Sequence, residues 1–200
     1  MSNTYTDEYR GYGTVAPTCL PSAEGNKISG ICIPYNKSAY IGKHIFEAVK
    51  PGALTELLKS NPKVGCIIEH DPLTLLGSSK CNLKLWDSTE GLRYSCTLPD
   101  TTYAKDLIAV MEANPGLYGA SFMMRLSPKD YVITKMPTGN YLRTIHTISK
   151  LIEITITAFA VYTATTADLG EAVKATGDGG ERAKGLLQYW KIRERAAAIV

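Results

Sequence analysis

Residues 118–124 read Tyr-Gly-Ala-Ser-Phe-Met-Met, and their alternation predicts a strand with one apolar face and one sparsely covered face. Ala120 and Phe122 fall on the apolar face, whereas Gly119 and Ser121 fall on the other. Small neighbours leave room for another backbone to approach the hydroxyl, as nucleophilic attack on a peptide carbonyl requires. A strand serine is more often an ordinary hydrogen-bonded residue, so a nucleophile also needs a base and an orienting group from elsewhere in the chain.

The sequence on both sides of this stretch predicts further strands, separated by short polar turns. Strands are expected at residues 27–34, 64–69, 75–86, 91–98, 131–135, 141–148 and 151–158. Apolar residues at helical spacing predict helices over 51–58 and 101–114. Many short strands with few helices favour an α+β fold that is mainly β, in the form of an antiparallel β-barrel with peripheral helices.

The chain of 200 residues is long enough for one domain, and its 44% of hydrophobic residues can build a sizeable core. Residues 1–26 contain scattered prolines and glycines without a sustained apolar period, which predicts a flexible N-terminal arm. The barrel domain is expected over 27–165. Residues 166–200 predict a helical tail, with a glycine-rich hinge at 177–180 before a basic last helix.

Charge and cysteine usage exclude several classes of protein. The net charge is +3, and the last twenty residues account for all of it, so no basic groove for nucleic acid is expected. Five cysteines without a Cys-x-x-Cys pair predict neither a disulfide framework nor a zinc ribbon, and indicate a reducing cytoplasm. The chain has no run of eighteen apolar residues, so no membrane span is expected. His44, His70 and His146 share no short ligand spacing, so we expect no metal and no cofactor.

Two residues outside the serine strand are candidates for the base and the orienting acid. His70 comes at the end of an apolar strand, immediately before a turn. Glu153 lies on the polar face of the strand over 151–158, where an isolated glutamate is more commonly exposed to solvent. A thiol hydrolase using Cys66 or Cys96 is disfavoured, because Cys66 lies too far along the His70 strand to meet the ring.

Short motifs occur in an order that resembles a known protein family. They are Phe-Glu-Ala-Val-Lys-Pro-Gly-Ala-Leu at 46–54, His-Asp at 70–71, Gly-Leu-Arg-Tyr at 91–94, Gly-Ala-Ser-Phe at 119–122 and Leu-Ile-Glu-Ile-Thr-Ile at 151–156. Together they resemble the HK97-type prohead maturation proteases of tailed bacteriophages, a family that is similar to the herpesvirus assemblins. The resemblance spans about residues 28–162 and implies a fold like that of the herpesvirus proteases.

The resemblance also implies roles for three residues: Ser121 as the nucleophile, His70 as the base and Glu153 as the group that orients His70. A serine hydroxyl is too weak an acid to ionise near neutral pH, so an imidazole must accept its proton. A carboxylate holds that imidazole in the required orientation and tautomer. In the herpesvirus relatives the third member is a second histidine, so His146 is the alternative to Glu153.

By the same resemblance, the chain is expected to be a serine endopeptidase that acts inside a viral procapsid in the host cell cytoplasm. Its expected partners are the scaffold protein and the major capsid protein. It would cleave the scaffold protein or the scaffold-like arm of the major capsid protein. Self-cleavage and a homodimer are left open. The alternative is a non-catalytic β-barrel module that binds capsid or scaffold, in which Ser121, His70 and Glu153 are ordinary strand residues. A Ser121 Oγ within about 3.2 Å of a His70 nitrogen would separate the two hypotheses.

Overall fold

The computed structural model describes residues 6–12, 18–22, 25–42, 44–114 and 118–158. All of them belong to one compact unit, which spans Met1–Ala164. The helical tail expected over 166–200, with its hinge at 177–180, lies outside the described residues.

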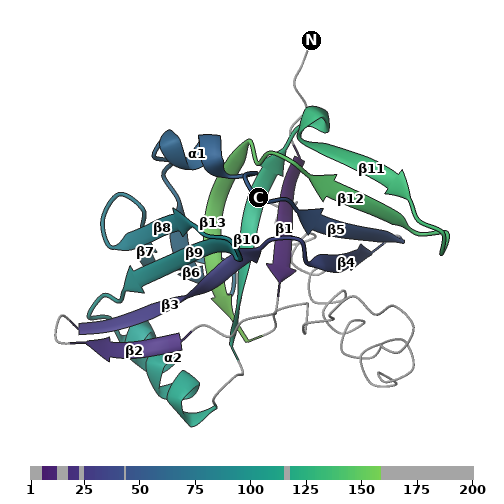
Figure 1. The fold of residues 1–200 in the computed structure, drawn as a ribbon. Helices are drawn as coiled ribbons and strands as arrows, with labels where there is room; N and C mark the ends of the chain where they lie inside the picture. The colour runs from purple at the N-terminus through teal and green to yellow at the C-terminus, as the bar shows by residue number, and fades with distance from the viewer. Residues whose placement is uncertain (1–5, 13–17, 23–24, 43, 115–117, 159–200) are drawn as a thin grey trace, which may run out of the picture. The chain divides into compact units, whose positions relative to one another are not determined.

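One sheet carries Ser121 and Glu153 on its strands, and the turn between two of its strands carries His70. Its strands, in spatial order, are β1 (Thr6–Tyr12), β10 (Gly119–Leu126), β13 (Lys150–Thr157), β6 (Gly65–Ile68) and β7 (Asp71–Ser78). Figure 1 shows β10 between β1 and β13. β13 and β6 pair in parallel, whereas the other ladders of this sheet are antiparallel.

Two further sheets of four strands complete the described part of the fold. One contains β2 (Thr18–Ser22), β3 (Gly25–Pro34), β9 (Gly91–Thr97) and β8 (Leu83–Asp87), and all its ladders are antiparallel. The other contains β11 (Tyr131–Lys135), β12 (Tyr141–Ile145), β5 (Ile45–Val49) and β4 (Ser38–Gly42), with β12 and β5 in parallel. The strand predicted over 75–86 is therefore divided between β7 and β8, which lie in different sheets.

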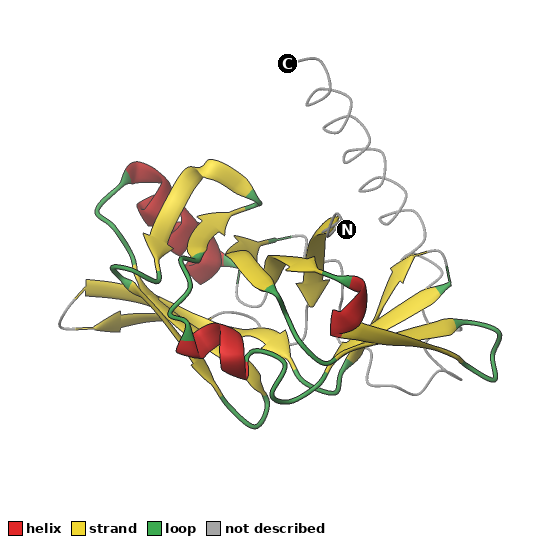
Figure 2. Ribbon diagram, turned by 90° about the horizontal axis from the view of Figure 1, so that it is seen from above, coloured by secondary structure: helices red, strands yellow, loops and turns green. Residues whose placement is uncertain are grey.

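The prediction of a mainly β fold is confirmed. Figure 2 shows few helices among many strands: α1 (Thr55–Lys59), α2 (Thr102–Ala113) and the short 3₁₀ helix η1 (Pro128–Asp130). The prediction of an antiparallel arrangement is wrong at two ladders, β12·β5 and β13·β6, which are parallel. Both ladders join strands that are distant in sequence, so the hairpin turns in the sequence do not predict them. The strand orders of the described residues form three open sheets, so closure into a barrel stays a prediction.

The N-terminal segment differs from the expected flexible arm over 1–26. Residues 6–12 form β1 and pair antiparallel with β10, and residues 18–22 form β2 and pair antiparallel with β3. Neither strand has a clear apolar alternation in the sequence, so their pairing depends on edges that other strands offer.

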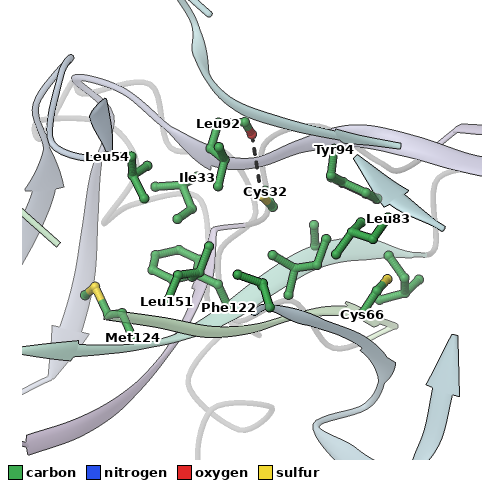
Figure 3. Close-up of a cluster of buried hydrophobic side chains, with 14 of the residues drawn as sticks. Cys32, Ile33, Leu54, Cys66, Leu83, Leu92, Tyr94, Phe122, Met124 and Leu151 are labelled. Atoms are coloured by element: carbon green, nitrogen blue, oxygen red, sulfur yellow. Dashed lines mark hydrogen bonds between the residues drawn. The ribbon is translucent and has the colours of Figure 1, made fainter. Parts of the chain in front are cut away.

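The hydrophobic core lies between the site-bearing sheet and the sheet that contains β3 and β9. Figure 3 shows Phe122 and Leu151 on one side of this core, facing Ile33 and Leu92 on the other. All four side chains are fully buried, and burial of each such side chain stabilises the fold by about 1.5–3 kcal/mol. The core therefore fixes β10 and β13 by their apolar faces and leaves their other faces for the site.

A β-bulge changes the predicted faces of β13. The ladder between β10 and β13 shifts register between Met123 and Met124, so that Ile152 has no partner in it. Leu151, rather than Ile152, consequently joins Ile154 in the core. A strict period of two would place Ile152 on the face of Ile154, but the bulge interrupts that period.

Candidate active site

Ser121 lies on β10 with its side chain on the face opposite the core. Ala120, Phe122 and Met124 alternate with it and are buried in the core, which confirms the predicted faces of this strand. Ser121 itself is only 2% exposed. The strand thus holds one hydroxyl in a shielded position on its second face.

Glu153 lies on β13, next to the serine strand. In this ladder Ser121 faces Thr155, and Glu153 faces Met123. Residues two apart on a strand share a face, so Glu153 and Ser121 are diagonal neighbours, roughly 7–8 Å apart between their Cα atoms. That separation leaves room for a ring between the two side chains. Glu153 is 8% exposed, so it is not a solvent-facing carboxylate.

The imidazole of His70 bridges these two side chains. Its Nε2 lies 2.9 Å from Oγ of Ser121, and its Nδ1 lies 2.5 Å from Oε1 of Glu153. An ionised Glu153 accepts a hydrogen bond from Nδ1–H, which leaves the Nε2 lone pair to accept the serine proton. The arrangement has the geometry of a nucleophile, a base and an orienting acid.

His70 reaches this position from a two-residue hairpin between β6 and β7. Ile68 and Asp71 pair at the base of the turn, and the two central residues, Glu69 and His70, have φ values of +50° and +56°. Two successive left-handed residues match a type I′ turn, which Asn-Gly usually occupies. Each non-glycine residue in this conformation costs roughly 1–2 kcal/mol, so other contacts must hold the turn.

Thr155 anchors the backbone of His70 to β13. The His70 N–H donates to Thr155 Oγ1 at 2.9 Å, and the Thr155 hydroxyl donates to the Ile67 carbonyl at 3.2 Å. Thr155 is fully buried. Because Thr155 is also the ladder partner of Ser121, one residue relates the position of the histidine to that of the serine.

Glu69 holds the same turn against the end of β13. Its Oε2 accepts a hydrogen bond from the Thr157 hydroxyl, and its Oε1 accepts one from the Ala158 N–H, both at 2.6 Å. The Glu69 N–H donates to the Ile156 carbonyl at 3.0 Å. Hydrogen bonds to a carboxylate are roughly twice as strong as neutral ones, so these contacts offset the strain of the turn.

The other candidate orienting groups have different surroundings. His146 is exposed in the connection between β12 and β13, and its backbone N–H donates to the carbonyl of Asp130. Asp71 uses its Oδ1 to accept the Leu73 N–H at 3.0 Å, within its own turn. The geometry therefore favours Glu153 as the group that orients His70.

The profile of one protein family matches residues 16–178, which is most of the chain, and the family is that of the caudovirus prohead serine proteases. The chain belongs to this family. The resemblance drawn from the motifs is confirmed, and the protein is a serine protease of phage capsid maturation.

The fold of this prohead protease is shared with a solved structure. The structure of the bacteriophage T4 capsid assembly protease, gp21, matches with a TM-score of 0.50 at 10% sequence identity. The match covers 78% of this chain and 99% of that chain, and at this identity it shows a common fold. A comparison with curated proteins finds no match.

The thiols of this prohead protease are mostly buried in the part of the chain that the structure describes. Cys32, Cys66 and Cys96 are buried, whereas Cys81 is exposed. A hydrogen bond with Cys96 and burial together raise the pKa of Cys66 well above its ordinary value. A thiol that keeps its proton is a poor nucleophile, which agrees with the sequence argument against a thiol hydrolase.

Within the described ranges, no group of three or more His, Cys, Asp or Glu side chains is arranged to hold a metal ion. No helix in that part of the prohead protease is long and apolar enough to cross a membrane.

Three residues around the prohead protease site were not predicted from the sequence: Glu69, Thr155 and Thr157. Thr155 and Thr157 alternate with Glu153, so their common face was readable from the sequence. Their partners were not readable, because the bonds to Glu69 and His70 span more than 80 residues.

Proposed function

We propose that Ser121, His70 and Glu153 are the nucleophile, the general base and the orienting acid of an endopeptidase. The observation that supports this proposal is the pair of contacts made by one imidazole: 2.9 Å from Nε2 to the serine oxygen and 2.5 Å from Nδ1 to the glutamate oxygen. The distance from Nε2 to the serine oxygen lies within the range of about 2.6–3.2 Å that a general base needs to accept a proton.

The proposed reaction passes through an acyl-enzyme. Ser121 Oγ attacks the scissile carbonyl carbon while its proton moves to His70 Nε2, and the resulting imidazolium is stabilised by Glu153. Nε2 then gives this proton to the leaving amine nitrogen as the C–N bond breaks. Water, deprotonated by the same nitrogen, attacks the acyl carbon and releases Ser121 with its proton restored.

The proposed substrates are the scaffold protein and the scaffold-like arm of the major capsid protein, cut inside the procapsid in the host cell cytoplasm. This chain is a further proposed substrate of its own. Support comes from family membership and from a fold shared with a capsid assembly protease. A barrel closed as in the herpesvirus proteases, and a homodimer, belong to the same proposal.

Co-expression with the major capsid and scaffold proteins of the same phage tests this function. Wild type should release fragments of one of them, detected by intact-mass spectrometry, and Ser121→Ala should release none. Ser95→Ala is a matched control, since Ser95 is a half-buried strand serine on β9. Equal fragments from wild type and Ser121→Ala would refute the assignment of the nucleophile, and the absence of fragments from all three would refute the proposed substrates.

The rival hypothesis, a non-catalytic capsid-binding module, is disfavoured by family membership and by the site geometry. A fluorophosphonate, whose fluoride leaves when serine attacks its phosphorus, separates the two without a known substrate. The endopeptidase should carry the label on Ser121, whereas a binding module should carry none.

A further inference from the structure

The candidate active site is closed in this conformation. Ser121 is 2% exposed, and the side chains of His70 and Glu153 are 8% and 11% exposed. A polypeptide substrate must place a backbone carbonyl against the serine oxygen, so the elements beside Ser121 decide its access.

The strand β1 lies directly beside the serine strand, in the same sheet. It pairs antiparallel with β10 over its whole length, with Gly11 opposite Ser121, Arg10 opposite Phe122 and Tyr12 opposite Ala120. β13 takes the other side of β10, so without β1 the serine strand would be the edge of its sheet (Figure 1).

A free strand edge is a binding surface for an extended peptide. Its unpaired N–H and C=O groups hydrogen-bond to an added strand, which is the mode called β-augmentation. An antiparallel strand added to β10 would run past Ser121 in the place that β1 now takes. An extended segment of a protein substrate and β1 thus require the same hydrogen-bonding groups.

The family profile gives an independent reason to treat β1 as separable from the catalytic fold. The match begins at residue 16, so β10, β13 and the His70 hairpin lie inside it and β1 lies outside it. β1 accordingly lies outside the part of the chain that matches the family profile.

We infer that the β10 edge is the docking surface for the substrate strand, and that residues 6–12 of the same chain occupy it as an internal competitor. This inference rests on the proposed function. The activity of the peptidase is low while β1 is paired and rises when β1 leaves the edge, because a substrate strand then gains the groups beside Ser121.

Proline substitutions in the full-length chain test the competitor. Along an antiparallel strand, every second residue directs its N–H toward the partner strand. Of the adjacent residues Glu8 and Tyr9, one therefore donates to β10, and the double substitution Glu8→Pro with Tyr9→Pro removes that donor. The matched control is Glu8→Ala with Tyr9→Ala, which keeps both N–H groups. The probe is the fluorophosphonate label on Ser121, and the proline pair should be labelled on the order of ten-fold faster than the alanine pair.

A peptide added in trans gives a second readout on the same variant. The peptide with the sequence of residues 6–12 should slow labelling of the proline pair back toward the alanine pair, and a scrambled peptide should not. Equal labelling rates for the proline and alanine variants, with no effect of the peptide, would overturn the inference. Labelling of Ser121 in those variants would still support the proposed function. No label on any variant, as in Ser121→Ala, would refute the proposed function itself.

A disulfide provides a test that does not depend on the proline pair folding. Asp7 and Arg125 are ladder partners, at a separation of Cα atoms that a disulfide spans. In Asp7→Cys with Arg125→Cys, oxidation should suppress labelling of Ser121 and dithiothreitol should restore it, whereas wild type should respond to neither. Unchanged labelling of the cross-linked chain, with the cross-link verified by mass, would also overturn the inference.

Discussion

His70 donates its backbone N–H to Oγ1 of Thr155 at 2.9 Å, although 85 residues separate the two in sequence. Thr155 is the ladder partner of Ser121, so the bond relates the turn that carries the histidine to the strand that carries the serine. The position of the His70 ring thus depends on a main-chain contact as well as on its own contacts with Ser121 and Glu153.

Thr155→Val should slow the enzyme without changing any proposed catalytic group. Valine has the same shape but leaves the His70 N–H without its acceptor, which costs about 1–3 kcal/mol and frees the turn. A displacement of the base by about 1 Å can lower kcat up to about 100-fold. Thr155→Ser keeps the hydroxyl and should recover most of the rate of Ser121 labelling; failure of serine to do so would show that the hydroxyl is not what matters.

Glu69→Gln should loosen the same turn from the other side. The variant loses the negative charge that accepts hydrogen bonds from Thr157 and Ala158, so both the thermal midpoint and the labelling rate should fall. Glu112→Gln, on the exposed side of α2, is the matched control and should change neither.

Glu69→Gln should also change the titration of Tyr118. Burial raises the pKa of Tyr118, and the charge of Glu69 raises it further. Removal of that charge favours the phenolate, so the pKa of Tyr118 should decrease in the variant. The absorbance titration of a variant that also carries Tyr118→Phe is subtracted to isolate the signal of Tyr118. An unchanged pKa of Tyr118 would mean that the carboxylate of Glu69 does not act on the phenol.

Glu153→Gln should lower kcat by roughly 10²–10⁴-fold with little change in KM, because an amide fails to fix the tautomer and to stabilise the imidazolium. His146→Ala should leave kcat unchanged, since His146 is exposed in the connection after β12. The opposite result, a large loss for His146→Ala and a small one for Glu153→Gln, would assign the orienting role to His146.

The buried thiols should make the protein less stable at alkaline pH. Burial raises the pKa of Cys32, and a hydrogen bond with Cys96 together with burial raises that of Cys66. In the unfolded chain these thiols lose their protons near pH 8.5, while the folded chain keeps them. The free energy of unfolding therefore falls as pH rises above that value, by up to about 1.4 kcal/mol per pH unit for each thiol.

Urea denaturation between pH 7.5 and 9.5 measures this slope. Cys66→Ala should reduce it, whatever the variant does to stability at neutral pH. Cys81→Ala should keep the wild-type slope, because Cys81 is exposed. A slope that is the same in both variants would show that the Cys66 thiol ionises in the folded protein.

Local pattern was enough to place most of β10 and much of β13. The period of two in residues 118–124 put Ser121 opposite Ala120 and Phe122, and the same period put Glu153 beside Thr155 and Thr157. Side-chain direction along a strand follows from the backbone alone, so these faces did not depend on the rest of the chain.

The sequence by itself therefore determined which residues share a face, a mainly β class and the motifs of the family. Only the tertiary structure decided the bulge at Ile152, the parallel pairing of β13 with β6, the left-handed pair Glu69 and His70, and the place of β1 beside Ser121. Each of these depends on hydrogen bonds between segments that are distant along the chain. The periodicity within one segment does not predict which other segment will supply its hydrogen-bonding partners.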